Sequence, residues 1–115
     1  MKITVTEYIS YNRWYRTIYH VFTYHEIDDD GSEYTKDHIL SEHKNSELLL
    51  DKHILDAFPK EEAEKIKAEW DKTAGAFVYI PPSLDSGDRL VIGEDEYDSE
   101  DAYLAAGWFW EDRVR

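Results

Sequence analysis

The chain has 115 residues, a net charge of −13 at neutral pH and 42% hydrophobic residues, with four Trp, nine Tyr and four Phe. This apolar and aromatic content argues against disorder, and the length suits a single domain, 1–115, with one core. The lack of cysteine excludes disulfides, a thiolate zinc site and a cysteine nucleophile, while the acidic field opposes direct binding to nucleic acid or to anionic membranes.

The first part of the chain predicts β-strands. Residues 3–10 alternate between apolar and polar side chains, which places Ile3, Val5 and Ile9 on one face. Residues 14–27 form a second β-rich run, and because this run is long for one strand we expect a bulge or a bend within it.

The middle of the chain turns from strand to helix. The acidic stretch 28–32 contains a glycine and predicts a reversal of the chain, and 36–45 is ambiguous between a loop and a short helix. Helices are predicted over 46–58 and over 59–74, the first capped by a serine and the second started by a proline and ended by a glycine. The second helix carries acids and bases in nearly equal number.

The last part of the chain predicts further short elements. Strands are expected at 76–80, 89–92 and 108–111, and a short helix capped by Ser99 is expected to reach Ala106. Together these patterns predict an α+β fold, a mostly antiparallel sheet of about five strands with two to three helices on one side.

Two sequence patterns are candidates for a metal site, and neither matches such a site well. Residues 26–37 partly follow a calcium-loop spacing, but Glu26 stands where aspartate is usual and the preceding residues read as strand instead of helix. His20 and His25 fall on opposite faces of one strand, and no H-E-x-x-H spacing occurs. We expect an acidic hairpin turn, ordinary histidines, no metal and no cofactor.

The sequence gives no sign of catalysis. With 26 acidic residues some pair of carboxylates is always close, so proximity alone says nothing about acid–base chemistry. There is no glycine-rich phosphate loop and no plausible nucleophilic triad, so we expect no catalytic residues. The nine tyrosines are too many for a small core, and some are expected on the surface, either as a simple cover of the sheet or as contact anchors.

The most unusual stretch is 94–101, in which six of eight residues are acidic. From Ala74 onward ten acids face three arginines and no lysine. Carboxylates on alternate residues of a strand stand about 6.6–6.8 Å apart, which is similar to the spacing of neighbouring phosphates in DNA. We therefore expect this stretch to bind a basic partner. The predicted partner-binding residues are Glu94, Asp95, Glu96, Tyr97, Asp98, Glu100 and Asp101.

In size, acidity and lack of cysteine, the chain resembles the DNA-mimic inhibitors of phages and mobile elements, which block restriction or CRISPR enzymes. This resemblance is one of composition and implies no site residues. It implies a non-enzymatic inhibitor that occupies the nucleic-acid-binding surface of a host protein, in the host cytoplasm if a phage encodes it. The alternatives are an immunity protein that neutralises a basic bacterial toxin, and a small hydrolase or ligand-binding protein that uses paired carboxylates.

Overall fold

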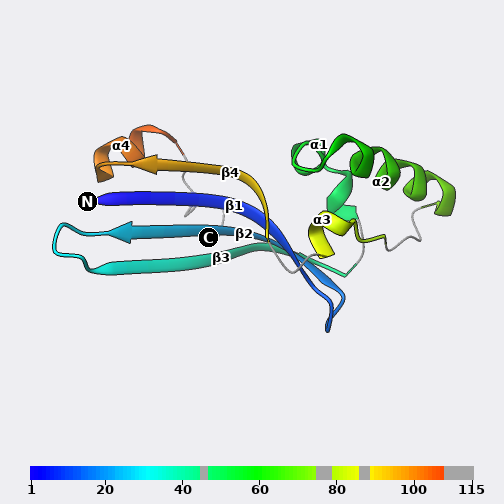
Figure 1. Ribbon diagram of the computed structural model, residues 1–115, viewed down its shortest axis with the longest axis horizontal. Coiled ribbons are helices and arrows are strands. Elements are labelled where there is room, and N and C mark those ends of the chain that lie inside the picture. The colour runs from blue at the N-terminus through cyan, green and yellow to red at the C-terminus, as the bar shows by residue number, and fades with distance from the viewer. Residues whose placement is uncertain (45–46, 75–78, 86–88, 108–115) are drawn as a thin grey trace.

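The computed structural model describes residues 1–44, 47–74, 79–85 and 89–107. A four-stranded sheet runs along the molecule, with most of the helices gathered at one end (Figure 1). In chain order the elements are β1 (Lys2–Asn12), β2 (Thr17–Ile27), β3 (Glu33–His43), the 3₁₀ helix η1 (Glu47–Leu50), α1 (Lys52–Leu55), α2 (Lys60–Thr73), α3 (Pro82–Asp85), β4 (Leu90–Tyr97) and α4 (Glu100–Ala105).

The sheet has the strand order β3-β2-β1-β4, and each of its three pairings is antiparallel. The first three strands form a meander, and β4 returns after the helices to pair with β1. This confirms the predicted α+β class with an antiparallel sheet. The predicted count of about five strands is wrong for the described residues, which contribute four.

The two faces of the sheet differ in composition. One face carries Ile3, Val5 and Ile9 of β1 together with Ile18 and Phe22 of β2, and all five side chains are buried. We call this the core face. The side chains that alternate with these lie on the opposite side, which we call the outer face. Because side chains alternate along a strand, the register assigns every sheet residue outside the two irregularities in pairing to one face.

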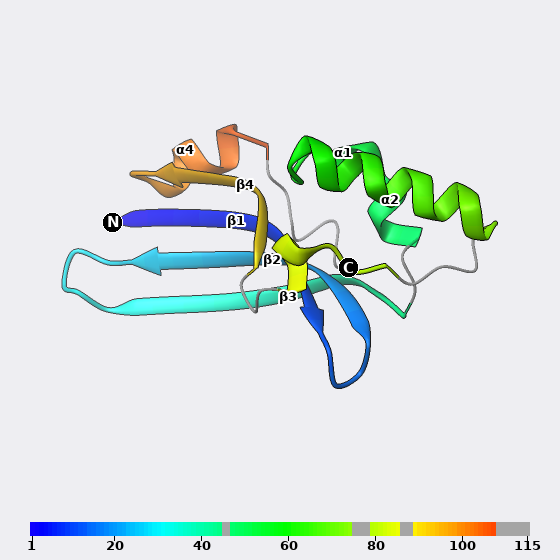
Figure 2. The same cartoon turned by 45° about the vertical axis from the view of Figure 1, so that its right-hand side comes forward.

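The core face holds two apolar clusters, one toward each end of the sheet. The larger one joins β1 and β2 to the helices, and its buried members are Ile9, Ile18, Leu49, Ile54, Leu55, Phe58, Ile66 and Leu84. The smaller one lies under α4 and consists of Ile3, Val5, Phe22 and Tyr103. Figures 1 and 2 show the corresponding layout, with η1, α1, α2 and α3 at one end of the sheet and α4 beside β4 at the other.

Short local signals set the helix boundaries. Asp51 caps α1 by accepting the backbone N–H of His53 at 2.8 Å, and Ser99 caps α4 by accepting that of Ala102 at 3.1 Å. Helix α2 begins after Pro59 and ends at Ala74, which adopts a left-handed conformation with a φ of 53°. No described helix is long and apolar enough to span a membrane.

Several predicted elements differ from the structure. The ambiguous stretch 36–45 belongs largely to the edge strand β3, which pairs with β2 along its whole length. The single helix predicted over 46–58 is divided into η1 and α1, because Asp51 caps a new helix in its middle. Most of the strand predicted at 76–80, and all of that at 108–111, lies outside the described residues; Tyr79 and Ile80 are not in a strand.

The predicted irregularity near 14–27 is present, but the extra residue belongs to the neighbouring strand. In the register between β2 and β3, His20 pairs with Ser41 and Val21 pairs with Ile39, so Leu40 of β3 has no opposite residue. The run predicted to start at residue 14 begins as a strand only at Thr17, after a turn at 13–16.

Candidate functional site

The acidic segment 94–101 spans the end of β4 and the start of α4. Its carboxylate side chains are exposed, whereas Tyr97 is half-buried, with its ring 5.9 Å from that of Tyr103. The chain is extended only through Tyr97, and Glu100 already opens α4. A continuous extended row from Glu94 to Glu100 is therefore not formed, and only Glu94 and Glu96 stand in line on one face of β4.

The same end of the molecule collects further acids from the β2–β3 turn. Asp29 binds the α-ammonium of Met1, and this contact raises the pKa of the amino terminus and lowers that of the Asp29 carboxyl. The Asp30 carboxylate accepts hydrogen bonds from the Ser32 hydroxyl at 2.6 Å and from the Ser32 backbone N–H at 2.9 Å. These hydrogen bonds lower the pKa of Asp30. Asp28 and Asp98 also act on the Met1 ammonium, so the turn and the end of β4 share one electrostatic environment. We call this the acidic end.

On the outer face, exposed carboxylates stand along both edges of the sheet. Glu94 and Glu96 lie on β4, and Glu33 and Asp37 lie on β3. The two edges are three strand spacings apart, which is about 14 Å. Hydroxyls of the inner strands hold two of these acids, because Thr6 donates to Glu94 at 2.9 Å and Thr23 donates to Asp37 at 2.7 Å.

Between the two edges, apolar side chains cross the outer face. Val91, Tyr8, Val21 and Ile39 are consecutive neighbours across β4, β1, β2 and β3. Ile39 and Val91 are 55% and 42% exposed, and Arg89 stacks on the Tyr8 ring at 5.0 Å. The four acids all lie on one side of this apolar row, toward the acidic end. An apolar row beside a charged patch is a composition that protein-binding surfaces also show.

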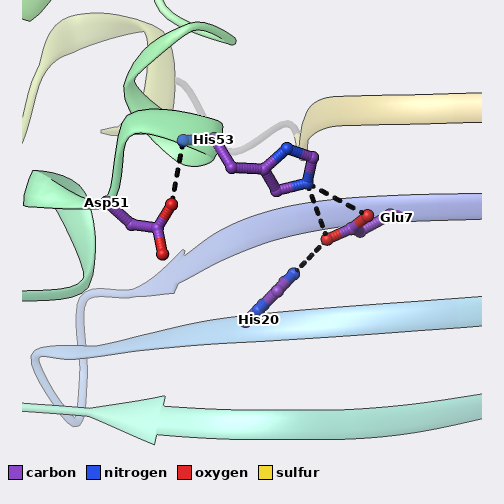
Figure 3. A network of polar contacts seen from close by, with 4 residues as sticks. All are labelled: Glu7, His20, Asp51 and His53. Atoms are coloured by element: carbon purple, nitrogen blue, oxygen red, sulfur yellow. Dashed lines mark hydrogen bonds and ion pairs between the residues drawn. The ribbon is translucent and has the colours of Figure 1, made fainter. Parts of the chain in front are cut away.

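A buried carboxylate occupies the core face between the two apolar clusters. Glu7 is 5% exposed, and its Oε2 lies 2.7 Å from Nε2 of His20 and 3.2 Å from Nε2 of His53 (Figure 3). The hydrogen bond with His20 holds the pKa of the Glu7 carboxyl below its usual range, against the opposing effect of burial, and the contact with His53 adds to the lowering. The trio joins β1, β2 and α1.

The trio has the parts of an oriented general base but not those of a complete catalytic site. A carboxylate bonded to an imidazole is the usual arrangement for holding a histidine base in one tautomer. Within the described chain, however, neither His20 nor His53 is hydrogen-bonded to a hydroxyl that it would activate. The network's clear role is to fasten α1 to the sheet. The sequence held one signal for it, since Glu7 falls on the inward face of an otherwise apolar alternation.

The histidine and calcium-loop patterns resolve into structural roles. His20 and His25 lie on opposite faces of β2, as predicted. The 26–37 segment is a hairpin between two strands, which confirms the predicted turn, and Gly31 supplies the positive φ of 87° that this turn requires. Among the residues that the structure describes, no group of three or more His, Asp or Glu side chains is arranged to hold a metal ion.

Comparison with known proteins gives no relative for this chain. No protein-family model, no curated protein and no solved structure matches it. The functional proposal therefore rests on the surfaces described above.

Proposed function

We propose that this protein is a non-enzymatic inhibitor that occupies a basic, nucleic-acid-binding surface of another protein as a DNA mimic. The proposed setting is the cytoplasm of a host cell, where a phage or another mobile element would use it against CRISPR or restriction enzymes. The proposed contact residues are the acids of the 94–101 segment, joined by Glu33 and Asp37 of the opposite edge. Tyr97 stays a predicted contact, but we expect it to contribute less to binding because its ring packs against Tyr103.

The observation that carries this proposal is the pair of acidic edges on the outer face. Glu94 and Glu96 on β4 stand across the sheet from Glu33 and Asp37 on β3. The outer-face residues between them on the two inner strands, among them Thr6 and Thr23, include no acid. The major groove of B-DNA is about 12 Å wide, which is close to the separation of about 14 Å between the edge strands. A surface that binds two phosphate rows would thus meet two carboxylate rows.

The runner-up is an immunity protein for a basic toxin, which would need charge complementarity but no imitation of a groove. The acidic edge on β3 distinguishes the two functions. A DNA mimic uses both edges, whereas an occluding immunity protein can act through the acidic end alone. A toxin gene beside the gene for this protein would independently favour the second function.

Displacement from DNA is the test that fits the proposal. Host lysate is bound to DNA-cellulose at low salt and eluted with the purified protein, and the eluted proteins are identified by mass spectrometry. We expect a nucleic-acid-binding protein to leave the column and the inhibitor itself not to be retained, because its field repels DNA. Association should be fast and should slow as salt is added.

Two variants and one control locate the surface. The first variant combines Glu94→Gln, Glu96→Gln and Asp98→Asn, and the second combines Glu33→Gln and Asp37→Asn. Both should elute the partner at least ten times less effectively. The control removes three exposed acids from the balanced helix α2, by Glu61→Gln, Glu64→Gln and Asp71→Asn, and should elute like the parent. If only the first variant fails, the immunity reading replaces the mimic; if neither fails, the outer face is not the interface.

A further inference from the structure

A pocket of about 270 Å³ opens at the acidic end, between the strands β2 and β3 and the helix α4. Its size is below the range of about 300–1,000 Å³ that is usual for drug-sized ligands, so it fits a small group or one side chain of a partner. The lining residues are Tyr24, Glu26, Tyr34, Lys36, Glu100, Tyr103 and Leu104.

Three tyrosine rings form the aromatic part of this wall. The Tyr24 ring meets Tyr103 at 5.4 Å and Tyr34 at 6.2 Å between centroids, and in both cases the planes are inclined by 64°. Rings set at steep angles to one another form a corner instead of a flat stack. The negative π-faces of such rings attract a cation within about 6 Å of their centroids.

Two carboxylates give the pocket its charge. Glu26 comes from β2 and Glu100 from the first turn of α4, and the Tyr24 hydroxyl donates to Oε1 of Glu26 at 3.2 Å. With Lys36 on the same wall, the lining carries two negative charges and one positive charge. The pKa of Tyr24 is raised, first by burial and then by the charge of Glu26, which agrees with an environment that disfavours a further anion.

We propose that this pocket binds a guanidinium group, such as the side chain of an arginine. A planar guanidinium stacks on tyrosine rings and hydrogen-bonds to carboxylates in the same plane, whereas an ammonium is more strongly hydrated and makes only point contacts. That the arginine belongs to a protein partner rests on the function proposed above. Binding of the guanidinium itself does not.

Lys36 gives the proposal a distinctive consequence. Its ammonium lies on the wall where the guanidinium would bind, so it opposes an incoming cation by charge and by competition for Glu26 and Glu100. Removing this charge should therefore strengthen binding, although it removes a polar group from the pocket. A non-specific contact elsewhere on the acidic surface would gain little from the removal of this one charge.

The test is an NMR titration of the purified protein with N-acetyl-arginine methylamide, with the lysine analogue and N-acetyl-glutamate methylamide as comparison ligands. We expect saturable binding of the arginine ligand in the millimolar range, with shifts confined to the rings of Tyr24, Tyr34 and Tyr103 and to Leu104. The lysine ligand should bind at least three times more weakly, and the glutamate ligand should not bind. Shifts that grow without saturation, or that are equal for arginine and lysine, overturn the proposal.

Variants sharpen the same titration. Tyr34→Ala, at a ring that is 52% exposed, and Glu100→Gln should each weaken arginine binding at least threefold, whereas Lys36→Gln should tighten it at least twofold. Glu61→Gln, at an exposed residue of α2, is the matched control and should leave arginine binding unchanged. Weaker arginine binding by the Lys36→Gln variant would show that Lys36 does not compete with the ligand. If arginine binds but no basic partner is found, the pocket stands and the inhibitor function fails. If a basic partner binds Tyr34→Ala as well as it binds the parent, the inhibitor function stands and the pocket takes no part in it.

Discussion

The two ends of this molecule are stabilised in different ways. At the helical end, eight buried apolar residues from the sheet and the helices pack into one cluster, and the surface helix α2 balances its acids with lysines. At the acidic end, four buried residues support a surface crowded with carboxylates. We infer a division between the two ends. Apolar packing at the helical end contributes more to the stability of the fold, whereas the acidic end carries more surface charge than solubility alone requires.

The largest effect is expected from a cavity at the helical end. Ile66→Ala, at a side chain with no exposed surface, should lower the free energy of unfolding by about 2–5 kcal/mol. Ile3→Ala makes the same truncation at an equally buried site of the acidic end and should cost less, because its cluster is smaller and collapses more easily. Urea denaturation of both variants measures the difference. The proposed division fails if Ile3→Ala is the more damaging change.

A smaller effect is expected at the junction of the two ends. Glu7→Gln keeps the shape but removes the charge that His20 and His53 contact, and should cost about 1–3 kcal/mol near neutral pH. The folded pKa of Glu7 lies below its ordinary value. Its contribution is therefore full above that value and disappears as the pH falls through the lower folded pKa. Unfolding curves of parent and variant should converge on acidification; a gap that stays constant with pH would contradict this role.

Near-zero or favourable effects are expected from neutralising the acidic segment. The combination of Glu94→Gln, Glu96→Gln and Asp98→Asn removes three exposed charges and should change stability by less than about 0.5 kcal/mol, or raise it by relieving repulsion. Added salt should raise the melting temperature of the parent more than that of the variant. The α2 control variant, with the same change in net charge, should keep the salt response of the parent.

The smallest effect is expected from metal ions. Asp29 and Asp30 are already bonded to the Met1 ammonium and to Ser32, so the hairpin offers calcium few uncommitted ligands. Melting curves recorded with EDTA, with added calcium and with added zinc should coincide. A rise of several degrees with calcium would show that the acidic end is a metal site.

Elements governed by local patterns were predictable from the sequence. The alternation of Ile3, Val5 and Ile9 marked the core face of β1, and the serine at 99 marked the start of α4. The proline at 59 marked the start of α2, although it stands just before the first helical residue instead of within it.

Elements governed by distant partners were not predictable in the same way. Strand β3 is an edge strand with many exposed polar residues, so its apolar alternation is too weak to identify it without β2 beside it. The trio of Glu7, His20 and His53 contains residues up to 46 positions apart, and the pocket brings Tyr24 close to Glu100. Because these residues are so far apart in the chain, no short sequence pattern identifies either group. For the candidate site, the acidic segment was visible, but its partner edge on β3 required the sheet register.

The charged edges have a consequence for how copies of this protein treat one another. An edge strand presents unpaired backbone groups that another chain can extend, and like charges along β3 and β4 discourage that addition near neutral pH. This protection should weaken as the net negative charge of the protein falls toward zero near the sequence pI of about 4.6. Because copies of the protein then no longer repel one another through their net charge, the exposed Ile39 and Val91 can take part in contacts between edges, and we expect ordered aggregates at mildly acidic pH.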